Sequence, residues 1–221
     1  MILRNRNDWK FAKTDKFWAE IAPLDHIVQI YENDDVLLKT LEGFVASGIK
    51  TGDGIVLIAT QKHLELLNFR LAANSIRLSD LEEAGQYFPV TAEELLDKIT
   101  VHSWPDESLF NSAVRDIIAK GRGESMRRVR VFSELEALLW QEGQNVATIR
   151  LEYLWGHICE TEAVCVLCGY PEPVFKNDAL SSIPHVCSIH TKVIDGSTGS
   201  ATEVYYHRTS KETSTTKGLN A

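Results

Sequence analysis

Apolar residues follow the period of a strand in some segments of the chain and the period of a helix in others. The segment 54–60 (GIVLIAT) is apolar on both faces, which is typical of a central strand in a sheet covered by helices on both sides. Shorter apolar or alternating runs predict further strands at 26–31 (HIVQIY), 86–90 (QYFPV), 127–133 (RRVRVFS) and 163–170 (AVCVLCGY).

Between these strands, apolar residues recur every three or four positions, as on one face of a helix. The predicted helices cover 33–48, 63–74, 91–97, 106–123, 134–143, 144–161 and 180–194. This alternation of strands and helices predicts an α/β fold with a doubly wound, mainly parallel sheet and helices on both faces.

The two ends of the chain differ from this alternating region. Residues 1–22 are predicted to form an N-terminal helical extension with Trp9, Phe17 and Trp18 on one face, and residues 23–194 form the main domain. From residue 195 to 221 the composition shifts to Ser, Thr, Gly and Lys, which predicts a polar, disordered tail containing at most a short strand at 203–208.

The net charge and the hydropathy of the chain argue against nucleic acids and membranes as binding partners. The chain has 221 residues, with 23 basic and 31 acidic residues and a net charge of -8, which disfavours direct binding to nucleic acid or to an anionic membrane. The densest basic run, RRVR at 127–130, leads into a predicted strand. Since apolar runs are far shorter than a membrane span, we expect a cytoplasmic protein without a membrane partner.

The junction after the central strand lacks a phosphate-binding loop. Many α/β nucleotide-binding proteins carry a glycine-rich turn with a lysine there. Here Ala59 is followed by Thr60-Gln61-Lys62-His63, which contains no glycine. Side chains therefore stand where phosphates would need backbone N–H groups.

Two glutamates are candidates for binding or catalysis. Glu134 follows the strand 127–133, where ligands bind in open α/β sheets, although Ser133 and Glu136 flanking it also fit a helix capping box. Glu152 lies in the apolar stretch LEYLW. A buried Glu152 needs a partner, for which Arg130 and His26 are candidates, whereas a solvent-facing Glu152 needs none.

Histidine and cysteine positions leave two interpretations open. His26 and His190 are either ligand contacts or residues with local hydrogen bonds. The spacing of Cys165, Cys168, Cys187 and His190 matches a zinc site on paper. However, Cys165 and Cys168 are three apart on a predicted strand and so point to opposite faces. We therefore expect core cysteines, with no metal and no cofactor.

The ordered segments DHIVQIYENDDVLLKTLEGFVASGIKTGDGIVLIAT, VRVFSELEALLW, LEYLW, LCGYP and HVCSIH resemble the MEDS domain, the methanogen/methylotroph, DcmR sensory domain, over about residues 24–194. The resemblance implies a fold like that of the RecA and KaiC ATPases without their phosphate-binding loop. It also implies sensing of small, hydrocarbon-like compounds, next to histidine kinase or DNA-binding output domains. Family positions fall on His26, Glu134, Trp140, Glu152, Cys187 and His190.

From the residues and the resemblance together, we expect a non-enzymatic sensor that binds a small ligand at the strand ends and signals through a partner protein. The partner would be a histidine kinase of a two-component system or a transcription regulator, and a homodimer is left open. The expected ligand-binding residues are His26, Tyr31, Arg130, Glu134, Trp140, Glu152, Trp155, Tyr170 and His190.

Two alternatives belong to other classes of protein. In a divergent RecA-like ATPase, Glu134 would activate water and Lys62 would replace the missing lysine. In a protein–protein interaction module, the aromatic residues of the N-terminal helix would dock on a partner or on a second copy of the chain.

Overall fold

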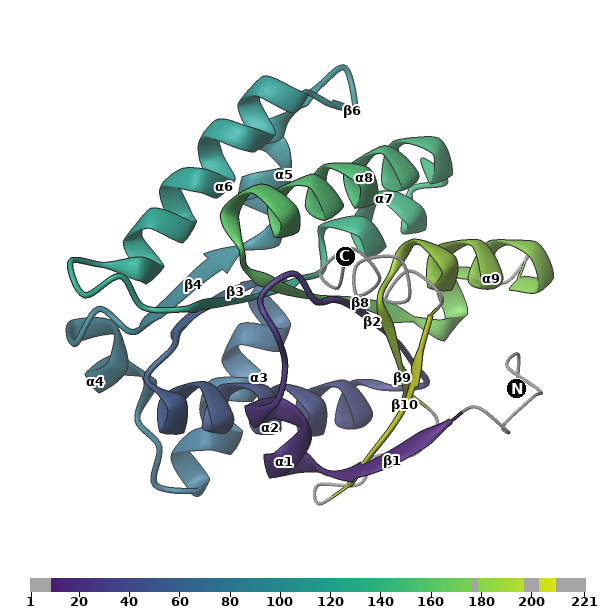
Figure 1. Cartoon of the computed structure of the whole chain (residues 1–221). Helices are drawn as coiled ribbons and strands as arrows, with labels where there is room; N and C mark the ends of the chain where they lie inside the picture. The colour runs from purple at the N-terminus through teal and green to yellow at the C-terminus, as the bar shows by residue number, and fades with distance from the viewer. Residues whose placement is uncertain (1–8, 176–178, 197–202, 210–221) are drawn as a thin grey trace, which may run out of the picture.

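The computed structural model describes residues 9–175, 179–196 and 203–209, and within them the chain forms one eight-stranded sheet with the strand order β1-β10-β9-β2-β8-β7-β3-β4 (Figure 1). The strands are β1 (Lys10–Lys13), β2 (His26–Tyr31), β3 (Gly54–Ala59), β4 (Tyr87–Thr91), β7 (Val129–Ser133), β8 (Cys165–Pro171), β9 (Lys192–Gly196) and β10 (Glu203–Arg208). The strands from β9 to β4 pair in parallel, whereas β10 pairs antiparallel with both β9 and β1.

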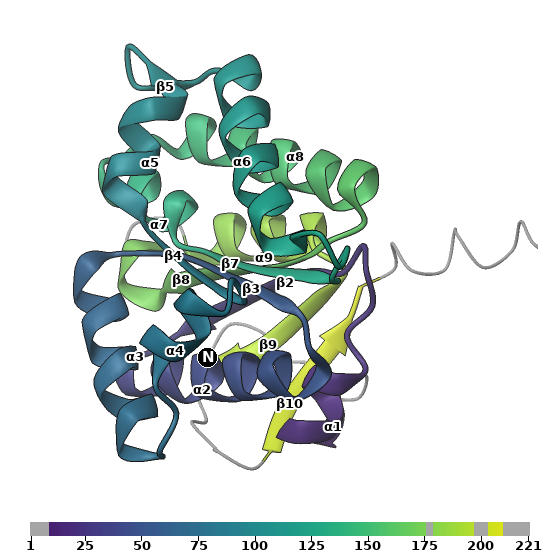
Figure 2. The same cartoon turned by 90° about the vertical axis from the view of Figure 1, so that its left-hand side faces the viewer.

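Helices cover both faces of this sheet, and the two groups are separated clearly in Figure 2. One face carries α1 (Thr14–Ala19), α2 (Asp34–Thr51), α3 (Gln61–Ala73) and α4 (Leu78–Glu83). The other face carries α5 (Ala92–Ile99), α6 (Glu107–Arg122), α7 (Leu135–Gln141), α8 (Asn145–Glu162) and α9 (Ala179–Ile189). The short hairpin of β5 (Thr100–Val101) and β6 (Trp104–Pro105) joins α5 to α6. The doubly wound, mainly parallel α/β fold is therefore confirmed.

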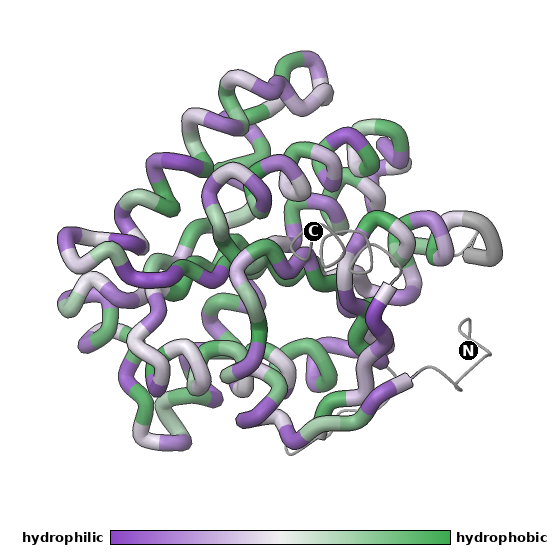
Figure 3. Tube along the Cα trace, viewed as in Figure 1, coloured by the Kyte–Doolittle hydropathy of each residue, from purple (hydrophilic) through white to green (hydrophobic). Residues whose placement is uncertain are grey.

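The apolar residues of the central strands form two hydrophobic clusters, one on each face of the sheet. Val56 and Val131 point to the side of α5–α9, and Ile55 and Leu57 point to the side of α1–α4. Colouring by hydropathy shows apolar positions along the central strands, with apolar and polar residues alternating on the helices (Figure 3). This burial on both faces explains why the strand at 54–59 has no polar face.

The junction between α2 and β3 depends on two glycines. The helix α2 runs past Gly48, which the sequence suggested as its end, and stops at Gly52, whose φ of 73° is left-handed. At Gly54 an added Cβ would lie 2.1 Å from the carbonyl oxygen of Gly121. Glycine at these positions lets β3 pack directly against the end of α6.

The N-terminal extension is not purely helical. The predicted helix is wrong for residues 10–13, which form the edge strand β1 and pair with β10. Phe17 and Trp18 of α1 are buried, and Trp18 packs edge-on against Phe44 of α2. These aromatic side chains belong to the core, so they do not offer an exposed docking face. Residues 1–8 of the predicted helix lie outside the described residues.

The C-terminal part of the chain continues the sheet beyond the predicted domain boundary at 194. The last predicted helix divides into α9 and the strand β9, which extends to Gly196, and the strand at 203–208 is present as β10. The short strand allowed for at 203–208 is therefore confirmed, and its antiparallel pairing with β9 and β1 satisfies its backbone groups. Residues 197–202 and 210–221 of that tail lie outside the described residues.

Candidate functional site

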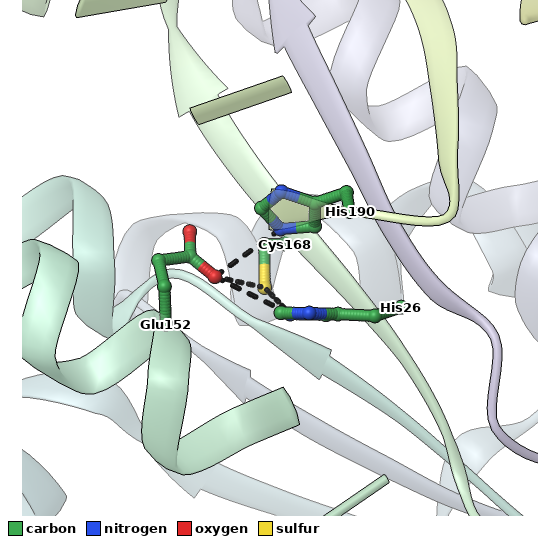
Figure 4. Close-up of side chains that lie close together, drawn as sticks. All are labelled: His26, Glu152, Cys168 and His190. Carbon is green, nitrogen blue, oxygen red and sulfur yellow. Dashed lines mark hydrogen bonds and ion pairs between the residues drawn. The ribbon is translucent and has the colours of Figure 1, made fainter. Parts of the chain in front are cut away.

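Four buried polar side chains meet under α8 and α9, three of them from β2, α8 and β8 and one from the α9–β9 junction. They are His26, Glu152, Cys168 and His190, hereafter the quartet (Figure 4). Side chains of a strand alternate between its faces, so Cys168 and Tyr170 of β8 point to the same side, toward the hydrophobic cluster that contains α8. Glu152 projects from α8, and His190 lies between α9 and β9.

The ligand atoms of the quartet converge on one point. Glu152 Oε2 lies 3.3 Å from His26 Nε2, 3.2 Å from His190 Nε2 and 3.7 Å from Cys168 Sγ. Cys168 Sγ is also 3.5 Å from His26 Nε2, and the two imidazole rings are 4.0 Å apart between centroids. Within the described part of the chain, this is the one group of His, Cys, Asp and Glu side chains placed closely enough to hold a metal ion.

Hydrogen bonds from neighbouring groups orient Glu152 and His190 within the quartet. The hydroxyl of Tyr170 donates to Glu152 Oε1, which leaves Oε2 facing the histidines. The Nδ1 of His190 lies 2.7 Å from the Val186 carbonyl oxygen. Because a carbonyl oxygen can only accept, Nδ1 carries the proton. The ring of Tyr170 in turn packs against Trp140 and Phe175, so aromatic side chains enclose the cluster on one side.

Burial and neighbouring charges shift the pKa values in this region in opposite directions. Burial by itself raises the pKa of Glu152, but His190 and His26 hold the pKa of that carboxyl well below its ordinary value. Burial and the charge of Glu152 raise the pKa of the Tyr170 phenol and of the Cys168 thiol. They also raise the pKa of Glu136, whose carboxyl accepts hydrogen bonds from the Ser133 hydroxyl. Glu152 is therefore the anion of the group.

Glu134 belongs to a different cluster, at the carboxyl ends of the strands on the α2–α3 face. Its carboxylate accepts hydrogen bonds from Thr60 N at 2.9 Å and from the Tyr31 hydroxyl at 3.3 Å, and lies 2.7 Å from His63 Nδ1. His63 Nε2 is 3.4 Å from Asp34 Oδ1, so the imidazole lies between two carboxylates. We call Tyr31, Thr60, His63 and Glu134 the Glu134 cluster.

Electrostatics in the Glu134 cluster favour a protonated imidazole. Burial lowers the pKa of His63, but the contacts with Glu134 and Asp34 raise it further, so the net direction is upward. The capping box suggested for Ser133 and Glu136 forms only in part, since the helix α7 begins after Glu134. The carboxylate of Glu134 reaches across to the end of β3 instead of capping its own helix.

Two of the expected site residues, Arg130 and Trp155, belong neither to the two clusters nor to the aromatic wall that Trp140 and Tyr170 form beside the quartet. Arg130 was a candidate partner of Glu152, and this pairing is wrong because Arg130 lies on the opposite face of the sheet. There its guanidinium pairs with Asp53 and donates to the Phe44 carbonyl oxygen at 2.9 Å. Trp155 packs edge-on against Phe110 in the core, with centroids 5.0 Å apart. The expected single site at the strand ends is thus divided among separate regions.

The quartet includes a residue that the sequence analysis left in the core. The opposed directions of Cys165 and Cys168 are confirmed, since the two belong to different hydrophobic clusters. The same alternation nevertheless places Cys168 beside Tyr170 and brings it to His26 and His190. Spacing of two on a strand could have linked Cys168 to Tyr170. His63 could have been linked to Glu134, because it lies in the first turn of the helix that follows a neighbouring strand.

These features define a class of protein, a doubly wound α/β domain that lacks a glycine-rich phosphate loop and buries a polar quartet beneath two helices. Residues 25–191 match the model of one protein family, MEDS, the MEthanogen/methylotroph, DcmR Sensory domain. The chain belongs to this family, as its resemblance predicted, and the matched range contains the whole quartet. The family description is consistent with a sensory role. A comparison with curated proteins found no match.

The length and hydropathy of the helices bear on whether any of them could span a membrane. Among the described residues, none of the helices is both long enough and apolar enough to cross a bilayer.

Proposed function

We propose that the protein is a non-catalytic, cytoplasmic sensory domain that binds a small ligand at the quartet and its aromatic surroundings. The observation that carries this proposal is the convergence of β2, α8, β8 and the α9–β9 junction on one buried point. A ligand there contacts all four elements at once. Its binding energy therefore depends on their relative positions, which is the requirement for a ligand to shift a conformational equilibrium.

The surroundings of the quartet favour a small molecule with an apolar body and a polar group. Trp140, Tyr170 and Phe175 supply an apolar wall, with Trp140 and Phe175 4.9 Å apart between ring centroids. The quartet supplies hydrogen-bonding groups and the charge of Glu152. Because these side chains are buried, ligand entry requires movement of α8 or α9, and this movement would be passed to a histidine kinase, a transcription regulator or a second copy of the chain.

Two contacts support this proposal over a RecA-like ATPase. Lys62 Nζ pairs with Asp34, and the Thr60 N–H at the end of β3 donates to Glu134. The lysine and the backbone group that a phosphate would need are thus engaged with carboxylates. A carboxylate at this position also repels a phosphate.

The proposal is tested by calorimetric titration of the full chain with short-chain alcohols, short halogenated hydrocarbons and ATP. We expect one of the small compounds to bind, and Trp140→Ala to weaken that binding by at least about 10-fold because an apolar wall is lost. Trp104→Ala, in the exposed β5–β6 hairpin, is the matched control and should bind normally. Absence of binding by folded protein contradicts the proposal. ATP hydrolysis that is lost in Glu134→Gln would establish the enzyme alternative instead.

A further inference from the structure

The quartet has the donor set of a transition-metal site. Two imidazole nitrogens, one sulfur and one carboxylate oxygen, all buried, lie within 4.8 Å of one another. Zn²⁺ takes these three kinds of donor, usually in a tetrahedral arrangement of four. We propose that the quartet binds one divalent transition-metal ion of the zinc class through His26 Nε2, Glu152 Oε2, Cys168 Sγ and His190 Nε2.

The distances between the donor atoms correspond to the edges of a zinc tetrahedron. With ordinary bond lengths, two nitrogen or oxygen donors on a tetrahedral zinc lie about 3.3 Å apart, and a sulfur lies about 3.6 Å from each of them. Glu152 Oε2 is 3.3 and 3.2 Å from the two imidazole nitrogens. Cys168 Sγ is 3.5 Å from His26 Nε2 and 3.7 Å from Glu152 Oε2. Four of the six edges thus have the required length before any ion binds.

The direction of the lone pairs also favours a cation. Since Nδ1 of His190 donates to the Val186 carbonyl, Nε2 is the nitrogen left to face Glu152 as a ligand atom. When that ring is neutral, the lone pairs of Nε2 and of the carboxylate face each other at 3.2 Å, and a cation between them removes their repulsion. A histidine whose second nitrogen donates to a backbone carbonyl is the arrangement commonly found around metal-ligating histidines.

Charge selects a divalent ion over a monovalent one. Glu152 supplies one negative charge and the thiolate of Cys168 a second, so a divalent ion gives a neutral complex in a site that is almost completely buried. The Cys168 thiol releases its proton to solvent when the sulfur–metal bond forms, and no oxidant or reductant is required. Thiolate and imidazole donors favour zinc-class ions over Mg²⁺ and Ca²⁺, which prefer oxygen ligands.

This inference deepens the proposed function, because the ion would occupy the same cluster that is proposed to receive the sensed ligand. The two can fail separately. Metal binding without a response to any small compound leaves the metal site intact and contradicts the ligand-binding proposal. Binding of a small compound to protein that takes up no metal supports the ligand-binding proposal and contradicts the metal site.

The test uses the full chain, freed of metal with a chelator, and titrated with Zn²⁺ and with Co²⁺ as a spectroscopic probe. We expect one equivalent of Zn²⁺ per chain in elemental analysis after gel filtration. Bound Co²⁺ should show the strong visible bands of a tetrahedral site and a thiolate-to-cobalt charge-transfer band. A stoichiometry well below one, or octahedral cobalt bands without sulfur coordination, overturns the proposal without the use of any variant.

Matched variants assign the ion to the quartet. Cys168→Ser should lose the charge-transfer band and the stoichiometric binding of Zn²⁺. Cys165→Ser, three residues away on the same strand but facing the other side of the sheet, should retain both. His190→Gln and the exposed His157→Gln form a second pair with the same expectation. Retention of full binding by folded Cys168→Ser and His190→Gln contradicts the assignment.

A further variant tests how Glu152 coordinates the ion while all four donors are kept. Tyr170→Phe keeps the aromatic ring and all four donors but removes the hydroxyl that holds Glu152 Oε1. We expect one bound equivalent with an affinity about 10- to 100-fold lower, because residues that hydrogen-bond to a metal ligand typically have effects of this size. An unchanged affinity would contradict monodentate coordination through Oε2.

Discussion

The two faces of the sheet bury charge in different ways. On the α1–α4 face, Asp53 is bound by two guanidinium groups, those of Arg128 and Arg130, and its pKa is lowered by them in spite of burial. On the α5–α9 face, Glu152 is bound by the Tyr170 hydroxyl and otherwise faces two imidazoles and a thiol. Both carboxylates are buried, yet only the first has partners that are cationic at every physiological pH.

This difference separates a structural ion cluster from a binding site. The donors of Arg130 are matched by acceptors, since the guanidinium also reaches the Phe44 carbonyl and the Thr51 hydroxyl. Around Glu152, by contrast, the nitrogen, sulfur and oxygen atoms of the quartet that can coordinate a cation lie close to one another. A cluster whose charges are already compensated contributes to the fold alone, whereas one that gathers lone pairs can also receive a cation or a polar ligand.

The largest loss of stability is expected on replacing Arg130. Replacing it by Met leaves Asp53 with Arg128, whose side chain is 34% exposed. We expect Arg130→Met to lower the free energy of unfolding by about 3–5 kcal/mol, the usual effect of removing one partner of a buried ion pair. Urea unfolding followed by circular dichroism measures this loss. Arg128→Met is the matched control, and an equal loss in both variants would show that burial of Arg130 contributes nothing additional.

The next variants compare the hydroxyl groups that contact the two glutamates. Tyr170→Phe removes the phenol next to Glu152, and we expect a loss of about 2 kcal/mol in unfolding free energy without added metal. Tyr31→Phe removes a longer contact of 3.3 Å to Glu134, which keeps Thr60 N and His63 as partners. Its expected loss is therefore below about 1 kcal/mol. Equal losses in urea unfolding would contradict the stronger dependence of Glu152 on its tyrosine.

The sequence was sufficient for the strands β2, β3, β4, β7 and β8, because a strand such as 54–59 is apolar on both faces only when both are covered. It missed β1 and β9, which lie at the other end of the sheet. It was not sufficient for the quartet. Glu152 and His26 are 126 positions apart in the chain, and only the parallel pairing of β2 with β8 beneath α8 brings them together. Of the two candidate partners of Glu152, His26 contacts it and Arg130 does not, because the place of Arg130 on a strand was known but the face that it occupies was not.

The Glu134 cluster is intermediate between the two compared regions, because its carboxylate pairs with an imidazole that can be charged or neutral. Its contribution to the unfolding free energy is expected to be the smallest of the three. The pKa of His63 is raised in the folded protein by Glu134 and Asp34. The protonated imidazole therefore contributes stability that is fully present below its unfolded pKa of about 6.5 and is lost as pH rises through the folded value. We expect the unfolding free energy to fall above pH ~6.5 with a slope of at most about 1.4 kcal/mol per pH unit from this group.

Glu134→Gln should flatten this slope, because the main source of the raised pKa of His63 is removed. Urea unfolding between about pH 6 and 9, in steps of ~0.5 pH units, measures the slope of the unfolding free energy. The exposed His157→Gln is the control and should keep the slope of the unmodified chain. An unchanged slope in Glu134→Gln would mean that His63 is neutral in the fold, and the cluster would then resemble the quartet more than the compensated pair of Asp53 and Arg130.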